Sequence, residues 1–266
     1  MEVSIIIPCN GISENIKNNV KSWQQLSKSV TIVDSYPACE ILKEFCNTHK
    51  ISYVIFNWRG GYPKKRQWAL DNLSLDHKWV LFLDDDEFVP EVFVNYLSNL
   101  TESSNIDGYE VLYDNWFLGR KLKYGIPMRK LVLIKHGCGS FQDLQEQSWS
   151  KFDMEVHEHF ICKSHVKIFP KRLEHRQIVS FAKLTEKHLH YAEWEVSRIR
   201  QKSNLDGSTI RQKIKNRFIT SAYFSIAYFF YHYFVKLGLL DGKQGLLYSI
   251  LKLHYFALIA SKFNEK

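Results

Sequence analysis

Cysteine is scarce in this sequence, and its spacing excludes a disulfide framework. The chain has five cysteines, at positions 9, 39, 46, 138 and 162, an odd number without a Cys-x-x-Cys pair. A chain of 266 residues buries about three quarters of its unfolded surface, so it needs neither disulfides nor a structural metal for stability. This cysteine content is typical of a reducing compartment.

The first residues do not predict an N-terminal targeting segment. The first residues, MEVSIIIP, contain no Lys or Arg and only a short apolar run. A signal peptide has a positively charged start and a longer apolar stretch, and a membrane span is longer still. We therefore expect a cytoplasmic rather than a secreted protein.

Two common nucleotide-binding motifs are absent. A dinucleotide-binding fold carries Gly-x-Gly-x-x-Gly after its first strand, where this chain has Gly11 alone, and the Walker phosphate loop is missing as well. Internal repeats and low-complexity linkers are also lacking. These absences disfavour dehydrogenases and phosphate-loop NTPases. With 45% hydrophobic and 24% charged residues, the composition is that of a folded globular chain.

The first 112 residues alternate short apolar runs with amphipathic stretches. Such runs are typical of strands covered on both faces, and the stretches between them of helices. We expect strands at 3–7, 30–33, 51–56 and 79–83, and helices at 38–46 and 63–73. A further helix is expected to end at about Leu26, with Ser13 or Asn10 as its N-cap. Repeated strand–helix–strand spacing predicts a parallel α/β sheet.

The pattern changes after Gly108. Residues 109–135 mix aromatic and basic side chains, which predicts irregular or mixed-strand structure, and from about residue 180 helical signals dominate, with breaks at 206–208 and 238–242. The sequence therefore predicts an α/β domain at 1–175 with a mostly parallel sheet and a helical C-terminal region at 176–266.

Positive charge is concentrated in one part of the chain. The net charge is +8, and residues 171–217 alone contain twelve Lys or Arg and five Asp or Glu. Such a region fits nucleic acid, anionic lipid headgroups, an anionic acceptor or simply a solvated helical face, and charge alone does not choose among them.

The segment 218–235 has no Lys, Arg, Asp or Glu, and nine of its eighteen residues are aromatic. It is at the short end of spanning length, and its polar residues disfavour a span. Two interpretations stay open, a helix lying at a bilayer interface between Arg217 and Lys236 and a buried helix that covers the sheet.

An acidic cluster, Asp84-Asp85-Asp86-Glu87, directly follows the apolar run WVLFL. This places it at the carboxyl edge of the expected sheet, where α/β folds bind ligands. Adjacent carboxylates repel each other, and a hard divalent cation with oxygen ligands relieves that repulsion. Asp84 and Asp86 are two residues apart and can point the same way. The cluster predicts a site for a hard divalent cation, with a solvated acidic turn as the alternative.

Other polar residues follow the remaining expected strands. Pro8 and Asn10 come after the first, Asp34 after the second, and the run Gly60-Gly61-Tyr62-Pro63-Lys64-Lys65-Arg66 after the third. Glycines allow close backbone approach to a ligand, and the basic run can face a phosphate or a base.

Taken in order, VSIIIPCNG, IVDS, GGYPKKRQWAL and VLFLDDDEFV resemble the nucleotide-binding half of a family 2 glycosyltransferase with the GT-A fold. Further on, NWFLGRKLKYG, EVHEHF, LHYAEWEVSRIRQKSN and the tail from YFVKLGLLDG resemble the bacterial lipopolysaccharide core β-1,4-glucosyltransferase branch of that family. The resemblance covers nearly the whole chain. It implies a nucleotide-sugar donor, with UDP expected, a Mg²⁺ or Mn²⁺ ion and inversion at the anomeric carbon.

The resemblance also implies roles on the donor side. Pro8, Asn10 and Asp34 match the nucleoside pocket. Lys65 and Arg66 match the contact with the base or diphosphate, and Asp84 and Asp86 match the metal-binding Asp-x-Asp. Asp85 stands where many relatives have a small apolar residue, which adds charge to the donor site.

On the acceptor side, Glu158 matches the carboxylate that removes the proton of the acceptor hydroxyl, with His157 beside it, and Arg129 would help to neutralise the departing diphosphate. An alternative reading of the same segment is a zinc site made by His157, His159, Cys162 and His165, although this spacing matches no tetrahedral site known to us. His190 also matches a family position, without an assigned role.

The sequence thus predicts an inverting, metal-dependent glycosyltransferase at the inner face of the cytoplasmic membrane. Its acceptor would be lipid-linked or a saccharide of lipopolysaccharide core or another surface polysaccharide, and it would touch anionic membrane peripherally. One alternative is an inactive, membrane-associated scaffold of the same fold. A nucleic-acid-binding protein is the other, and the acidic cluster disfavours it.

Overall fold

The computed structural model describes residues 1–101, 105–143, 159–162, 165–176, 181–204 and 216–265. The chain divides into two compact units. Unit 1 takes its residues from Met1–Trp116, Pro127–Glu146 and Asp153–Ile178, and unit 2 from Phe117–Ile126, Gln147–Phe152 and Val179–Lys266. The segment 117–126 therefore belongs with the C-terminal helices, a grouping that nothing in its sequence indicates.

Four parallel strands form one side of the central sheet in unit 1. In spatial order they are β3 (Ser52–Phe56), β2 (Val30–Ser35), β1 (Val3–Pro8) and β4 (Trp79–Phe82). After β1 the chain adds strands on one side, and with β4 it returns to the other. The carboxyl edge between β1 and β4 is therefore a switch point, the position where α/β sheets bind ligands.

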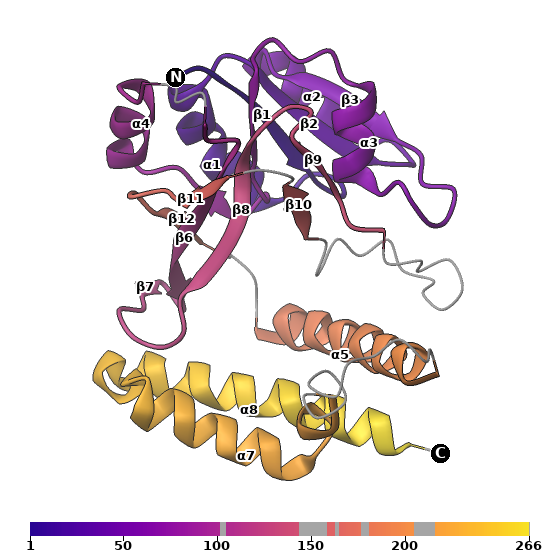
Figure 1. Cartoon of the computed structure of the whole chain (residues 1–266), viewed down its shortest axis with the longest axis vertical. Helices are drawn as coiled ribbons and strands as arrows, with labels where there is room; N and C mark the ends of the chain where they lie inside the picture. Colours follow the sequence, from indigo (N-terminus) through magenta and orange to yellow (C-terminus); the bar gives the residue numbers. More distant parts are fainter. Residues whose placement is uncertain (102–104, 144–158, 163–164, 177–180, 205–215, 266) are drawn as a thin grey trace. The chain divides into compact units, whose positions relative to one another are not determined.

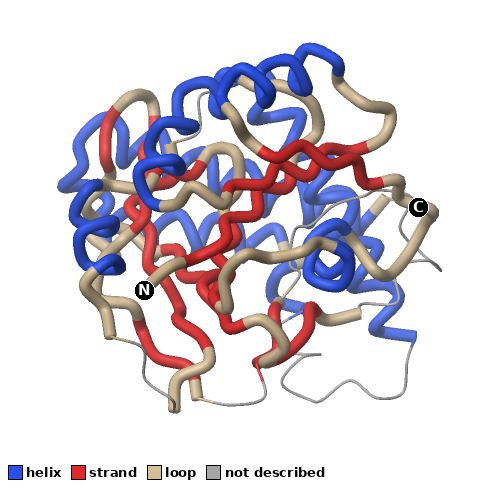
Figure 2. The backbone as a smooth tube through the Cα atoms, turned by 90° about the horizontal axis from the view of Figure 1, so that it is seen from above, coloured by secondary structure: helices blue, strands red, loops and turns tan. Residues whose placement is uncertain are grey.

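Beyond β4 the sheet is mixed. Figure 2 shows the strands of the molecule in red among the helices in blue. β8 (Met128–Lys135) is antiparallel to β4, and β6 (Gly108–Phe117) is antiparallel to β8. β12 (Leu173–His175) runs parallel to β6, and the two-residue strand β5 (Glu87–Phe88) is antiparallel to β12. The region after Gly108 thus forms the mixed strands that the sequence predicts.

Three short strands complete unit 1. β11 (Val166–Ile168) pairs with β6, and β9 (Gly139–Phe141) forms a separate two-stranded sheet with β10 (Phe160–Cys162). The segment that joins β9 to β10 includes 144–158, which lie outside the described residues.

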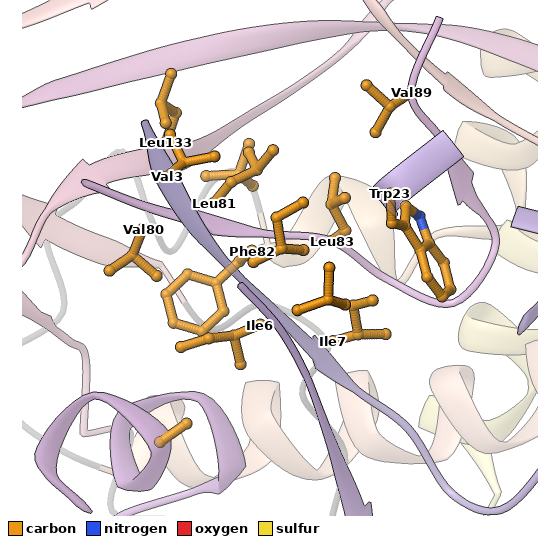
Figure 3. Close-up of a cluster of buried hydrophobic side chains, with 14 of the residues drawn as sticks. Val3, Ile6, Ile7, Trp23, Val80, Leu81, Phe82, Leu83, Val89 and Leu133 are labelled. Atoms are coloured by element: carbon orange, nitrogen blue, oxygen red, sulfur yellow. The ribbon is translucent and has the colours of Figure 1, made fainter. Parts of the chain in front are cut away.

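Four helices cover the sheet of unit 1, namely α1 (Glu14–Leu26), α2 (Glu40–His49), α3 (Lys65–Asn72) and α4 (Glu91–Ser98). Right-handed crossovers place α1 and α2 on one face and α3 on the other. Since both faces are covered, every residue of β1 and of β4 is buried. Figure 3 shows the resulting core, in which β1 and β4 side chains pack with Leu133 and Trp23.

Unit 2 contains the helices α5 (Phe181–Asn204), α7 (Ala222–Phe230) and α8 (Gly242–Asn264), together with the short strand β7 (Arg120–Lys121). A π-helical turn at Tyr231–Val235 and a 3₁₀ turn at Gly238–Asp241 join α7 to α8, which lie side by side as a hairpin (Figure 1). α5 packs on α8 through Ala192, Val196 and Ile259.

The expected single segment at 218–235 is divided in the structure. α7 has nine residues, and the π turn that follows buries His232, whose Nδ1 lies 2.8 Å from Ser249 Oγ on α8. The helix break expected at 238–242 coincides with the 3₁₀ turn, whereas the break expected at 206–208 lies outside the described residues. The prediction of an α/β chain with a mostly parallel sheet and a helical C-terminal region is confirmed.

Candidate active site

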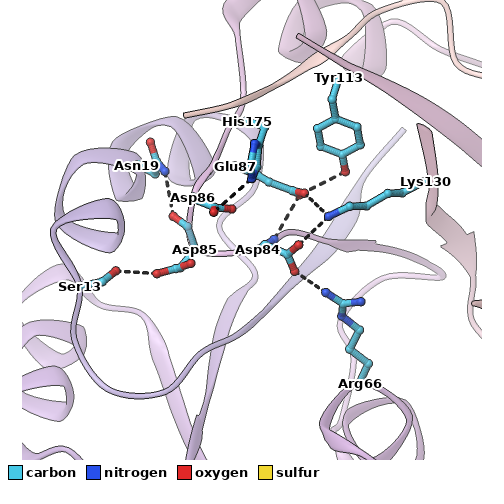
Figure 4. A network of polar contacts seen from close by, with 10 residues as sticks. All are labelled: Ser13, Asn19, Arg66, Asp84, Asp85, Asp86, Glu87, Tyr113, Lys130 and His175. Carbon is cyan, nitrogen blue, oxygen red and sulfur yellow. Dashed lines mark hydrogen bonds and ion pairs between the residues drawn. The ribbon is translucent and has the colours of Figure 1, made fainter. Parts of the chain in front are cut away.

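The acidic turn 84–87 joins β4 to β5 at the carboxyl edge of the parallel strands, and its side chains diverge (Figure 4). Asp85 faces α1, where its Oδ2 accepts a hydrogen bond of 2.6 Å from the hydroxyl of Ser13 and its carbonyl oxygen accepts one of 2.9 Å from Asn19. Ser13 is also the N-cap of α1, accepting from the N–H of Ile16 at 3.2 Å. The carboxylate of Asp85 therefore lies at a helix N-terminus, which favours negative charge.

Asp84 faces two cationic side chains. Arg66 on α3 contacts its Oδ1, and Lys130 Nζ on β8 lies 2.6 Å from its Oδ2. Burial alone would raise the pKa of Asp84, but Lys130 and Arg66 together hold it well below its usual range. Asp84 therefore stays ionised at any physiological pH.

Glu87 is the most deeply buried carboxylate of the acidic turn, with its side chain 1% exposed. Its Oε1 lies 2.8 Å from Lys130 Nζ, and its Oε2 accepts hydrogen bonds from the hydroxyl of Tyr113 at 3.1 Å and the backbone N–H of Asp84 at 3.2 Å. Burial raises the pKa of Glu87 to about 7, against the opposing effect of Lys130. Glu87 thus ties the acidic turn to β6 and β8.

Asp86 pairs with His175, the last residue of β12. His175 Nε2 lies 3.2 Å from Asp86 Oδ2, and the carbonyl of Asp86 accepts a hydrogen bond of 2.7 Å from the N–H of Arg176. Burial would lower the pKa of His175, but the charge and hydrogen bond of Asp86 raise it above its ordinary value. The antiparallel register of β12 with β5 sets His175 opposite Glu87, and this brings the His175 side chain to that of Asp86.

Asp34 organises the loops at the other end of the site. Its side chain is fully buried and accepts hydrogen bonds from the N–H groups of Gly11 at 2.7 Å, Ser35 at 2.9 Å and Cys39 at 3.2 Å and from the hydroxyl of Tyr53 at 2.8 Å. Gly11 has φ +75, a conformation that glycine adopts without strain. One carboxylate therefore fixes the loops after β1 and β2 to β3.

Pro8 and Asn10 lie where the sequence places them, at the carboxyl end of β1. Pro8 is the last residue of that strand and is buried, whereas Asn10 is exposed in the loop that follows. Of the two, only Asn10 presents a polar side chain at the sheet edge, next to the Gly11 backbone that Asp34 holds.

The basic run at the start of α3 divides between two tasks. Lys65 is 5% exposed, and its Nζ donates to the carbonyl oxygen of Cys9 at 2.5 Å and to Ser35 Oγ at 2.7 Å. It bridges the ends of β1 and β2. Arg66, the next residue, reaches Asp84 instead.

Arg129 and Lys130 are neighbours on β8, so their side chains point to opposite faces of the sheet. Arg129 Nε lies 3.4 Å from Glu110 Oε2 and its side chain is 51% exposed, while Lys130 enters the acidic cluster. The structure places Lys130, rather than Arg129, beside Asp84 and Glu87.

The expected acceptor-side residues Glu158 and His157 lie outside the described residues. Of the alternative zinc ligands, His159, Cys162 and His165 are described, and Cys162 Sγ contacts Cys138 Sγ at 3.6 Å. Within the described residues, no group of three or more His, Cys, Asp or Glu is arranged to hold a metal ion.

Three residues that the sequence does not single out contact the acidic turn, namely Tyr113, Lys130 and His175. Glu87 was visible as the last member of the acidic run. Lys130 and His175 carry no spacing signal relative to the acidic turn, because strand register alone brings them to it.

No protein-family model matches this chain, and no curated protein matches its sequence. Its structure is similar to the mannosyltransferase PcManGT from Pyrobaculum calidifontis, solved with GDP-Man and Mn²⁺, with a TM-score of 0.52 and 13% identity over 98% of this chain and 86% of that one.

Two further solved structures show weaker similarity. TarS 1–349 of S. aureus with UDP-GlcNAc has a TM-score of 0.45 and 14% identity, over 99% of this chain and 89% of that one. The 4-diphosphocytidyl-2C-methyl-D-erythritolsynthase of Anaerococcus prevotii has a TM-score of 0.43 and 10% identity, over 71% and 96%.

The likeness to the mannosyltransferase shows the fold. The chain has a GT-A-like α/β fold, as its sequence motifs predict. Membership of glycosyltransferase family 2 and of the lipopolysaccharide core branch stays a prediction, since no family model matches.

Proposed function

We propose that this protein is an inverting glycosyltransferase that uses a nucleotide-sugar donor and a divalent cation, Mg²⁺ or Mn²⁺. The observation that carries the proposal is the cluster around the acidic turn, which lies at the carboxyl edge of the sheet, at the switch point between β1 and β4. The GT-A-like fold and the order of the sequence motifs support the same function.

The donor site would lie along the loops that Asp34 holds together. Gly11 and Asn10 provide backbone and amide groups for the nucleoside, and the buried carboxylate of Asp34 keeps those loops in place before a donor binds. Preorganisation of this kind lowers the entropy that binding has to overcome. A UDP-sugar is the donor we infer, from the sequence resemblance.

The residues that fit a divalent cation are Asp86 and His175. A carboxylate oxygen and an imidazole nitrogen converge at 3.2 Å, and both are ligand types that Mn²⁺ accepts, the remaining positions being open to diphosphate and water oxygens. When bound, the cation would neutralise charge on the departing diphosphate. Asp84 lies between Arg66 and Lys130, two cations that would add positive charge on the same side of the site.

The acceptor side rests on the sequence resemblance. Glu158 would remove the proton of the acceptor hydroxyl as the oxygen attacks the anomeric carbon from the side opposite the diphosphate, which inverts that carbon in a single displacement. The acceptor we infer is lipid-linked or a saccharide, in lipopolysaccharide core or another surface polysaccharide. We infer that the protein acts at the inner face of the cytoplasmic membrane.

A thermal-shift panel tests the proposal. The protein is heated with UDP, GDP, CMP and dTDP sugars, each with Mn²⁺ and with a chelator. A donor at about 100 times its dissociation constant stabilises the fold by about 2.7 kcal/mol, enough to raise the melting temperature by several degrees. We expect a shift with one nucleotide class, larger with Mn²⁺.

A matched pair of variants locates the cation. Asp86→Asn should abolish the Mn²⁺-dependent part of the shift, whereas Asp76→Asn, at an exposed position, should retain it. Absence of any shift in the wild-type protein would favour the inactive scaffold, and equal Mn²⁺ responses in both variants would remove Asp86 from the metal site.

A further inference from the structure

One surface of unit 2 combines exposed apolar side chains with basic ones. It consists of residues 117–126 and residues 230–243, the bend between α7 and α8, and we call it the tip surface. In the bend, seven of the eleven residues 230–240 are large apolar side chains more than a third exposed, among them Phe230, Phe234, Val235 and Leu240. Residues 117–126 add Leu118, Tyr124 and Ile126, which are similarly exposed.

The two segments are locked together by backbone contacts. Both carboxylate oxygens of Asp241 accept hydrogen bonds from the N–H groups of Lys123 and Tyr124, at 2.9 to 3.1 Å, and the N–H of Gly125 donates to the carbonyl of Lys236 at 2.9 Å. The tip surface is therefore preformed rather than assembled on binding.

Close packing at the bend requires small residues at two positions. A Cβ atom on Gly125 would lie 2.6 Å from His232 Nε2, and one on Gly245 would lie 1.9 Å from the carbonyl oxygen of Gly238. Real Cβ atoms do not approach so closely, so these glycines set the close contact of the segment 117–126 and of α8 with the bend. The exposed side chains consequently project from a rigid base.

Charge on the tip surface has one sign. Its two segments contain five Lys or Arg and one Asp, a net charge of +4. That Asp is Asp241, which is 3% exposed and engaged by backbone N–H groups. It is also the sole carboxylate in the sequence of 117–126 and 216–264. An approaching surface therefore meets lysine and arginine but no exposed carboxylate.

We propose that the tip surface docks this protein on an anionic lipid bilayer, with the aromatic and aliphatic side chains of the bend at headgroup depth and the surrounding basic residues on lipid phosphates. Aromatic rings and Lys or Arg are the side chains that bilayer interfaces accommodate. Contact cores between proteins are instead depleted in Lys, which disfavours a second copy of the chain as the occupant.

In this proposal the bend lies in the membrane interface and does not span the bilayer. α7 and the π turn together have fourteen residues, roughly 21 Å of helix, less than the roughly 30 Å of a hydrocarbon core. The stretch Gly238–Asn264 is long and apolar enough to cross a membrane by length and composition. However, Lys243, Lys252 and His254 are spread along it, and Ile259 packs on α5.

Vesicle binding tests the proposal, independently of the proposed function, because the vesicles contain neither donor nor acceptor. The full-length protein is sedimented with vesicles of phosphatidylcholine and with vesicles of equal parts phosphatidylcholine and phosphatidylglycerol. We expect binding to the anionic vesicles alone, reversed by high salt. No binding to them, or binding that only detergent reverses, which would indicate a span, overturns the proposal.

Two matched pairs of variants locate the surface. Val235→Ser should lower the partition coefficient by about tenfold and Val92→Ser should leave it unchanged; the two valines are 66% and 60% exposed, and Val92 is on α4 in unit 1. Lys243→Glu should lower it by on the order of 30-fold, and Lys21→Glu, at an exposed position of α1 in unit 1, should leave it unchanged.

Variants of a pair with equal partition coefficients would contradict the assignment of the surface. Light scattering of the protein without vesicles tests whether a second copy of the chain occupies the tip surface instead. A wild-type dimer that Val235→Ser dissociates would make the tip surface an interface between copies of the chain, and the lipid proposal would fall.

Discussion

His175 Nε2 lies 3.2 Å from Asp86 Oδ2 although the two residues belong to distant parts of the sequence. The pair joins the acidic turn to β12, and its two side chains are the cation ligands that we propose. The contact depends on the antiparallel pairing of β12 with β5, which sets Glu174 opposite Phe88 and His175 opposite Glu87.

Replacing His175 should weaken cation binding more than folding. In His175→Gln the Mn²⁺ concentration that gives half of the donor-induced thermal shift should rise by about 100-fold, because an imidazole ligand is lost while Asp86 remains. His77→Gln is the control, since His77 pairs with Glu2 far from the acidic turn. An unchanged Mn²⁺ dependence in His175→Gln would remove His175 from the metal site.

Lys130 should be a major determinant of stability. Lys130→Met removes the cation that faces both Asp84 and Glu87, leaving buried negative charge uncompensated, and we expect a loss of about 3 kcal/mol in the free energy of unfolding, measured in urea. The double variant Lys130→Met/Glu87→Gln should recover part of that loss, because Gln carries no charge. If the double variant loses as much stability as Lys130→Met and Glu87→Gln lose together, the two residues do not interact.

Asp34→Asn should destabilise the donor loops. An amide offers one acceptor oxygen where the carboxylate has two, so its NH₂ group would face a donor, either the N–H of Cys39 or that of Gly11. We expect a loss of about 2 kcal/mol in unfolding free energy together with weaker donor binding. Asp76→Asn, at an exposed position, serves as the control, and equal stability of the two variants would contradict the positioning role of Asp34.

Unfolding of the helical unit should depend on pH through His188. This side chain is buried on α5 against the ring of Tyr255, and burial, reinforced by Lys252, His254 and Lys187, lowers its pKa from 6.5 to about 4. Between these values the unfolded chain binds the proton more readily, so His188 contributes stability above pH 6.5 that is lost as the pH falls toward 4.

The size of this effect can be measured with a neutral replacement. We expect His188 to account for about 2 kcal/mol of the loss between pH 7 and pH 4. His188→Phe should show a correspondingly flatter dependence of unfolding free energy on pH in urea titrations. A slope equal to that of the wild-type protein would mean that His188 titrates alike in both states.

The parallel half of the fold could be predicted because each element is local. Apolar runs of strand length mark β1 to β4, and the acidic run 84–87 directly follows one of them, so its place at the sheet edge follows from chain order alone. The strands and helices begin and end within a few residues of their expected bounds.

Residues brought in by register could not be predicted. Whether Arg129 or Lys130 faces the acidic turn depends on the pairing of β8 with β4 and β6, and the β6 pairing includes an irregularity between Tyr109 and Glu110. A shift of one residue would exchange the two side chains. The structure brings Lys130 to Asp84, and the role expected for Arg129 beside the departing diphosphate stays a prediction.

The grouping of 117–126 with the C-terminal helices was equally out of reach. Its link is Asp241, whose carboxylate binds the backbone N–H groups of Lys123 and Tyr124. Backbone groups carry no sequence signature, because every residue except proline has one.

The ion pairs of the acidic turn also have a consequence for the order in which ligands arrive. Asp84, Asp86 and Glu87 each face a basic side chain there, namely Arg66, Lys130 or His175, and Asp85 faces the N-terminus of α1 instead. Under the proposed function, a divalent cation alone would add positive charge to carboxylates that are already paired, and a nucleoside diphosphate alone would add negative charge. The charges of the two ligands nearly cancel when both bind. We therefore expect cooperative binding, in which cation and nucleotide each raise the affinity for the other by the same factor.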